Sequence, residues 1–301
     1  MDIAGGTGSL SRAVKDKNTP LRLYLQQKFP NARPIQAAYK SEAGPITVES
    51  AGAAAATVGT AMDLVVRFLL DPHDVPRSAR ILLPFDEYED VIDALSRTAG
   101  EAVHDGERGR QVFSQAIWAL ALCVEAHRTG GMSSPLILDL FRSGEFDVQT
   151  MLSQAPAGAL HELDALRGLA ERVLVPRLQR PFHLGPEFDT SKRGDGIDTR
   201  LIAAEADLIC NGLLLDIKTQ LGNKNSAGIR KDTLSADHLY QLLAYALLDY
   251  SDTYKITQLG LYSARYGGLH VWSLASITSI MAEHEVDFGA ARQDIWDMLH
   301  A

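Results

Sequence analysis

The feature that most constrains this chain is the pair Asn211-Gly212, which separates two largely apolar segments. Residues 201–210 read LIAAEADLIC, and residues 213–220 read LLLDIKTQ. Asn-Gly is the preferred pair for a two-residue hairpin turn, because both central residues need a positive φ. The sequence therefore predicts an antiparallel hairpin in which Cys210 pairs with Leu213.

This register places charged side chains on one face of the hairpin. It puts Asp207 opposite Asp216 and Glu205 opposite Lys218, with all four on the same face because side chains alternate along a strand. Two opposed carboxylates repel each other, whereas a hard divalent cation such as Mg²⁺ binds to one or two of them. Lys218 could then orient a water or offset the charge of a phosphate. The alternative is an exposed hairpin with charged side chains that serve only solvation.

The opposite face of the hairpin is apolar. We expect it to pack on helices through the following residues: Leu208, Leu213, Leu215, Ile217, Ala204 and Ala206.

The hairpin lies in the second half of the chain, and the sequence pattern changes from mainly helical to mixed helix and strand near residue 180. Residues 1–180 are predicted to be mainly helical, with one helix over 56–70 and a central apolar one within 87–130. Residues 181–301 alternate strand and helix patterns, with a helix over 235–250 that Ser235 caps and strands around Gly267-Gly268. This arrangement predicts an α/β fold with a large helical N-terminal part.

Composition excludes several classes of protein. The chain has 301 residues, 46% of them apolar and 22% charged, which is typical of a globular protein. Its two cysteines are too few for a disulfide framework or, within one chain, an iron–sulfur cluster. We expect no membrane segment and no signal peptide, and hence a cytoplasmic protein. The net charge of −9 disfavours general nucleic-acid binding, but residues 218–231 carry four cations and no acid.

The order of the charged residues resembles a known family. Asp207, followed by Asp216-Ile217-Lys218, looks like the D…(D/E)-x-K core of the PD-(D/E)XK nucleases. Gln241 and Tyr245, in the next helix, look like the Q-x-x-x-Y motif of the RecB-like exonuclease branch. Residues 59–63 resemble an upstream G-T-x-x-H pattern, with Asp63, also an oxygen ligand, in place of histidine.

The resemblance implies a restriction-endonuclease-like core, a central mixed sheet flanked by helices, over residues 181–301, to which the helix 56–70 would also belong. It implies one or two Mg²⁺ or Mn²⁺ ions bound by Asp207, Asp216 and the carbonyl of Ile217, with Asp63 as a further ligand. Lys218 would support the attacking water, and Gln241 and Tyr245 would contact DNA or brace the site.

Further residues have both a functional and a purely structural interpretation. Glu187, Glu205 and His238 could reach the metal site or serve other roles. A set of cations could contact nucleic-acid phosphates or simply be solvated: Lys192, Arg193, Lys224, Arg230, Lys231 and Arg265.

The expected function is metal-dependent hydrolysis of DNA phosphodiester bonds in repair, recombination or defence against foreign DNA. RNA remains an alternative substrate. The chain has no helicase motif, so we expect it to act alone, as an oligomer, or beside a separate helicase or defence-system protein. The main rival is a catalytically inactive protein of the same fold that binds nucleic acid or a protein partner. A second rival is an interaction protein in which the helical half is the working part.

Overall fold

The computed structural model describes residues 8–80, 86–128, 134–188 and 202–300. Its centre is a mixed five-stranded sheet with the order β10-β9-β6-β5-β2. The strands are β2 (Phe182–Leu184), β5 (Leu208–Cys210), β6 (Leu213–Lys218), β9 (Gln258–Ser263) and β10 (Gly268–Ser273). Strands β6 and β9 are parallel and the other neighbours are antiparallel. Helix α11 (Ala236–Leu248) lies between β6 and β9 in the chain, as a parallel pair requires.

The predicted hairpin is confirmed. Cys210 pairs with Leu213 and Leu208 with Leu215, in the expected register. Asn211 and Gly212 have φ values of 44° and 77°, the left-handed conformation that the two-residue turn requires. The turn residues therefore determine which side chains of β5 and β6 share a face.

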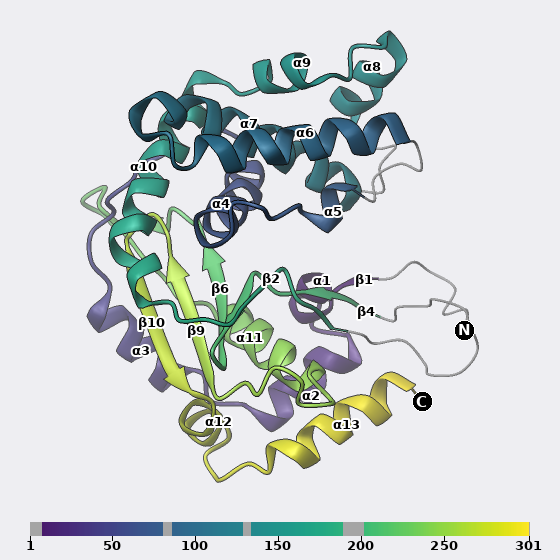
Figure 1. The fold of residues 1–301 in the computed structure, drawn as a ribbon. Coiled ribbons are helices and arrows are strands. Elements are labelled where there is room, and N and C mark those ends of the chain that lie inside the picture. The colour runs from purple at the N-terminus through teal and green to yellow at the C-terminus, as the bar shows by residue number, and fades with distance from the viewer. Residues whose placement is uncertain (1–7, 81–85, 129–133, 189–201, 301) are drawn as a thin grey trace.

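One face of the sheet is covered by the middle of the chain. The buried residues of this layer pack with Leu208, Leu213, Leu215 and Ile217, as expected for the apolar face of the hairpin. Figure 1 shows this layer above the sheet. It contains α4 (Ala55–Leu70), α5 (Arg77–Arg80), α6 (Asp86–Ala102), α7 (Gly106–Arg128), α8 (Pro135–Ser143), α9 (Val148–Ser153), α10 (Ala157–Val173) and the short 3₁₀ helix η1 (Val175–Arg177).

The other face is covered by helices from both ends of the chain. A second buried cluster joins Leu214 and Ile209 to α11 and to the terminal helices. Ser235 accepts a hydrogen bond from the backbone N of His238 and caps α11, as predicted. The terminal helices are α1 (Leu10–Lys15), α2 (Pro20–Lys28), α3 (Arg33–Glu42), α12 (Leu274–Ala282) and α13 (Phe288–His300).

Residues from both sides of position 180 therefore pack together in each of the two buried clusters. Residues 10–39 pack with the C-terminal half, on the opposite side of the sheet from α4–α10. The apolar residues of this N-terminal segment, such as Leu10, Leu25 and Phe29, are core residues of the α/β unit. The fold is an α/β fold with a central mixed sheet between helical layers and a large helical part N-terminal to it.

Two small sheets complete the described fold. Strands β1 (Gly8–Ser9), β4 (Ile202–Glu205) and β3 (Glu187–Phe188) form one of them in the order β1-β4-β3. Strands β7 (Asn223–Lys224) and β8 (Arg230–Lys231) form the other. In the part of the chain that the structure describes, no helix combines the length and the apolar character needed to cross a membrane.

Candidate active site

Asp207 lies between β4 and β5, at the point where the chain changes its pairing partner. Gly185 N donates to Asp207 O at 3.1 Å and Ala206 N donates to Pro186 O at 3.0 Å, so the chain leaves β6 and pairs with the segment before β3. Glu205 consequently pairs with Glu187, and the predicted pairing of Glu205 with Lys218 is wrong. Ala204 and Ala206 are displaced with it and join the second buried cluster rather than the first.

Asp207 nevertheless stays beside Asp216. Its Oδ2 atom accepts a hydrogen bond of 2.6 Å from the backbone N of Ile217, in place of a ladder bond between the strands. Asp216 is only 3% exposed, and its Oδ2 atom lies 2.7 Å from Lys218 Nζ. The structure thus brings together the three residues that the sequence singled out first, at the end of β6.

Burial makes this arrangement electrostatically unfavourable without another cation. Burial, and next the charge of Asp216, raise the pKa of Asp207 to about 6. Burial alone would lower the pKa of Lys218, but the charges of Asp216 and Asp207 outweigh it and raise this pKa. One ammonium group therefore faces two buried carboxylates that repel each other.

Helix α11 braces Lys218 through a chain of hydrogen bonds. Lys218 Nζ donates to Gln241 Oε1 at 3.3 Å, and Gln241 Nε2 donates to Tyr245 Oη at 3.3 Å. Tyr245 Oη donates to the backbone O of Glu205 at 2.7 Å. Gln241 and Tyr245 are one helical turn apart, so both reach the sheet from the same face of α11. They connect the lysine to Glu205, the last residue of β4.

Helix α4 supplies a further carboxylate. In Figure 1 the end of β6 points toward α4, and a Cβ atom on Gly59 would lie 3.4 Å from Thr219 Oγ1. Asp63 lies one turn after Gly59. Burial, and next the charge of Asp207, raise the pKa of Asp63 well above its ordinary value. Its Oδ1 atom is buried and accepts no hydrogen bond within the described part of the chain. Asp63 is therefore close enough to Asp207 for the charge of one carboxylate to affect the other.

Two arginines near this cluster were not among the residues that the sequence singled out. Arg67 lies one turn after Asp63, with Nε 2.8 Å from Asp74 Oδ2 and Nη1 3.5 Å from Glu205 Oε1. Arg128, the last residue of α7, is exposed, and its Nη1 atom donates to Thr60 Oγ1 at 3.3 Å. The charges of both arginines oppose the rise in the pKa of Glu205 that burial causes. No local sequence motif identifies Arg67 or Arg128 as a site residue, because it is the packing of α4 and α7 that brings them to the end of β6.

The remaining acidic and imidazole candidates lie at the edge of the cluster. Glu187 forms an ion pair with Arg77 at 3.2 Å beside Glu205. Burial, and next the charge of Lys218, lower the pKa of His238 to about 4, so its ring is neutral at pH 7. Its Nδ1 atom is buried and has no hydrogen-bond partner among the residues described.

The candidate phosphate-binding cations separate into distinct groups. Lys224 and Lys231 are exposed, and Arg230 is partly buried. Lys192 and Arg193 lie outside the described residues. The interpretation of Arg265 as a nucleic-acid contact is wrong, because this residue is 2% exposed and forms a 2.6 Å ion pair with the fully buried Glu162. It is a structural arginine that joins β9 to α10.

The donor set fits a divalent cation held by few protein ligands. Across the described ranges, no group of three or more His, Cys, Asp or Glu side chains is placed to hold a metal ion. Asp207 and Asp216 supply two carboxylates, and Asp63 adds an orphaned carboxylate oxygen. Mg²⁺ is commonly bound through one or two carboxylates and keeps several waters. The site therefore fits Mg²⁺ or Mn²⁺ better than a metal enclosed by protein ligands.

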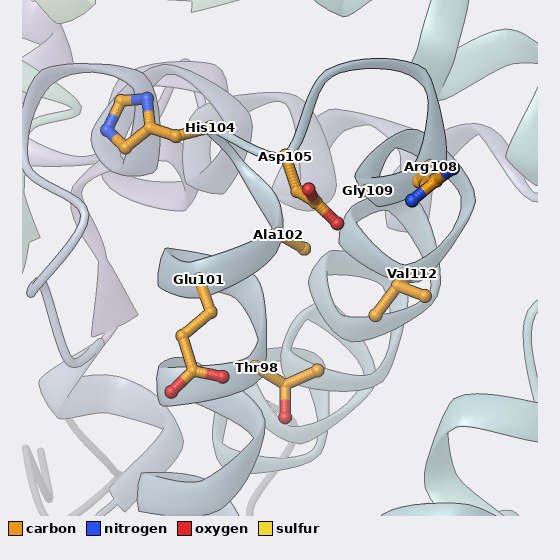
Figure 2. Close-up of a pocket in the computed structure, with 8 residues that line it drawn as sticks. All are labelled: Thr98, Glu101, Ala102, His104, Asp105, Arg108, Gly109 and Val112. Atoms are coloured by element: carbon orange, nitrogen blue, oxygen red, sulfur yellow. The ribbon is translucent and has the colours of Figure 1, made fainter.

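A separate hollow of 460 Å³ lies at the turn between α6 and α7. Figure 2 shows its lining, which includes Thr98, Glu101, His104, Asp105 and Arg108. Helix α7 begins here and ends at Arg128, so at 1.5 Å per residue the hollow is on the order of 30 Å from Arg128, the end of this helix that lies near the carboxylates. It is not part of the candidate site.

Comparison with known proteins adds no relative: no protein-family model, curated protein or solved structure matches this chain. We therefore infer the function from the chemistry of the site.

Proposed function

We propose that this protein is a metal-dependent nuclease that hydrolyses DNA phosphodiester bonds in the cytoplasm, in DNA repair, recombination or defence against foreign DNA. The observation that carries the proposal is the meeting of Asp207, Asp216 and Lys218 at the end of β6, with Lys218 hydrogen-bonded to Gln241. Folding alone gives no reason to bury two repelling carboxylates beside one lysine.

The chemistry follows from the charges of these residues. Asp207 and Asp216 would hold Mg²⁺ or Mn²⁺, with Asp63 available as a further oxygen ligand. A bound divalent cation lowers the pKa of water and polarises a phosphoryl oxygen. Lys218 Nζ, which lies 2.7 Å from Asp216 Oδ2, would orient the attacking water or stabilise charge on the phosphate.

Other residues would fix this geometry. Gln241 and Tyr245 hold Lys218 and the backbone of Glu205 in place. Arg128 is exposed at the end of α7 and presents a guanidinium group near the acidic cluster, where it could bind a substrate phosphate. This would give the helical layer a direct part in substrate binding.

The alternative function is an inactive protein of this fold that binds nucleic acid or a protein partner. The intact pair of carboxylates and the lysine favour the enzyme, since a protein that only binds has no need of a buried repulsive pair. The net charge of −9 favours the alternative.

A cleavage assay separates these functions. Linear, closed circular and single-stranded DNA are incubated with the protein and Mg²⁺ or Mn²⁺, beside Asp216→Asn and Lys218→Ala. Matched controls are Asp139→Asn and Lys255→Ala, whose side chains are 75% and 76% exposed and belong to surface ion pairs. The proposal requires cleavage by the wild type and both controls and its loss in both site variants. Absence of cleavage and of metal binding in the wild type would favour the alternative.

A further inference from the structure

The short hairpin β7–β8 is an anchored arm, here called the 223–231 arm. Gly222 precedes it with a φ of 65°, and a Cβ atom at this position would lie 2.0 Å from Lys231 O. Tyr266 Oη donates to Leu221 O at 2.6 Å, and Arg230 Nη1 donates to Gly222 O at 3.0 Å. These contacts hold the base of the arm against the end of β6, only a few residues after Lys218.

The tip of the arm is ordered by its own hydrogen bonds. Asn225 Oδ1 accepts from the backbone N of Ala227 at 3.0 Å and of Ile229 at 2.9 Å. Asn225 N also donates to Ile229 O at 2.9 Å. The loop is therefore closed, yet it leaves Ile229 56% exposed, a larger fraction than for any other large apolar side chain found exposed in the described ranges. Ile229 is therefore held in an exposed position at the tip of an ordered loop.

The charge of the arm contrasts with that of the protein. Lys224 and Lys231 are exposed on its two strands, and residues 218–231 contain no acid although the net charge of the chain is −9. Arg230 is engaged at the base, where its Nε atom lies 3.6 Å from Glu49 Oε2. The two lysines are thus exposed cations that an anionic partner can reach. They lie on either side of Ile229 in the sequence, and the pairing of Lys224 with Arg230 and of Asn223 with Lys231 places them on opposite faces of the hairpin.

We propose that the 223–231 arm binds duplex DNA, with Lys224 and Lys231 on backbone phosphates and Ile229 inserted as a wedge between base steps. This proposal rests on the proposed nuclease function, which makes DNA the substrate. Apolar wedges flanked by cations unstack duplex steps in this way. Platforms for single strands use aromatic rings instead, and residues 223–231 contain none. The arm would position the duplex beside Asp216 and Lys218.

The test measures binding without cleavage. The full-length protein is titrated in EDTA against a fluorescent duplex at several salt concentrations. Lys224→Gln with Lys231→Gln should reduce the slope of log affinity against log salt by about 2, close to 1 for each phosphate that the protein no longer neutralises. Lys255→Gln is the matched control, since Lys255 precedes β9 and lies at the opposite end of the parallel β6–β9 pair from the arm. It should leave the slope unchanged.

A second measurement tests the wedge. A duplex with 2-aminopurine should brighten when the wild type binds, because unstacking relieves quenching. Ile229→Ser should abolish this increase and weaken binding by about tenfold, the change that corresponds to burying one aliphatic side chain. Leu23→Ser is the control, because Leu23 is 54% exposed on α2 and belongs to no part of the arm.

The outcomes separate the arm from the nuclease. If the wild type cleaved DNA and all arm variants bound the duplex as the wild type does, the proposal for the arm would be wrong and the proposed nuclease function would be unaffected. Arm-dependent duplex binding by a protein that neither cleaves DNA nor binds Mn²⁺ would support the arm and refute the nuclease. If the wild type bound vesicles containing phosphatidylserine through Ile229 but did not bind the duplex, the arm would be a membrane contact and the proposal wrong.

Discussion

Replacing Asp207 with asparagine should stabilise the metal-free protein above pH 6. Burial and the charge of Asp216 raise the pKa of Asp207 from 3.8 to about 6. Between these two values the folded protein binds more protons than the unfolded chain, so the free energy of unfolding falls as the pH rises. A shift of this size corresponds to about 3 kcal/mol, at about 1.4 kcal/mol for each pKa unit.

Asparagine is suitable for this test because it keeps the local hydrogen bond. Its side-chain oxygen can still accept from the backbone N of Ile217, which Asp207 Oδ2 contacts at 2.6 Å. The assay is urea unfolding in EDTA from pH 4 to pH 8, followed by circular dichroism. The measured quantity is the free energy of unfolding of Asp207→Asn minus that of the wild type. This difference cancels the contributions of titrating groups that do not interact with Asp207.

We expect the difference to be near zero at pH 4 and to increase to about 3 kcal/mol above pH 6. Asp139→Asn, at an exposed carboxylate, should give a flat difference near zero. Millimolar Mg²⁺ should reduce or reverse the advantage of Asp207→Asn at pH 8, since only the wild type keeps both carboxylates. A wild type that is more stable than Asp207→Asn at pH 8 in EDTA would refute the reasoning.

Three further predictions concern the surroundings of the site. Arg265→Ala and Glu162→Ala should each cost about 3–5 kcal/mol in urea unfolding, because each leaves a buried charge unpaired, and the double variant should cost less than their sum. Tyr245→Phe should cost about 1 kcal/mol in the same assay, because it removes the hydrogen bond to the backbone O of Glu205; an unchanged stability would mean that Tyr245 does not brace the strand break. Burial and the charge of Lys218 lower the folded-state pKa of His238 to about 4, so the wild type should lose about 3 kcal/mol of stability as the pH falls from 6.5 to 4. His238→Gln should not show this loss, and a pH profile of stability equal to that of the wild type would contradict the prediction.

The hairpin shows what the sequence could predict. Asn211-Gly212 admits one turn geometry, and the turn determines the pairing of Cys210 with Leu213 and the faces of β5 and β6. The positions of Asp216 and Lys218 follow from this local chemistry. The predicted pairing register was wrong at Glu205, because here the chain no longer pairs with β6 and pairs with β3 instead. This change depends on a tertiary partner rather than on local residues.

Longer-range packing accounts for the other differences. Arg265 follows a strand and looked available to a phosphate, but α10 brings Glu162 against it and buries both. Arg128 looked like the end of a core helix, yet it lies beside Thr60 near the acidic cluster. The hydrophobic periodicity of the sequence does not predict these side-chain contacts, because they depend on how the α4–α10 layer packs on the sheet.

The most direct test of the proposed metal site is titration of the metal-free protein with Mn²⁺ by calorimetry at pH 8. We expect saturable binding by the wild type, at least tenfold weaker binding by Asp207→Asn and Asp216→Asn, and unchanged binding by Asp139→Asn; a tenfold loss corresponds to about 1.4 kcal/mol. Equal binding by all four proteins, or none by the wild type, would contradict the claim that Asp207 and Asp216 form a metal site.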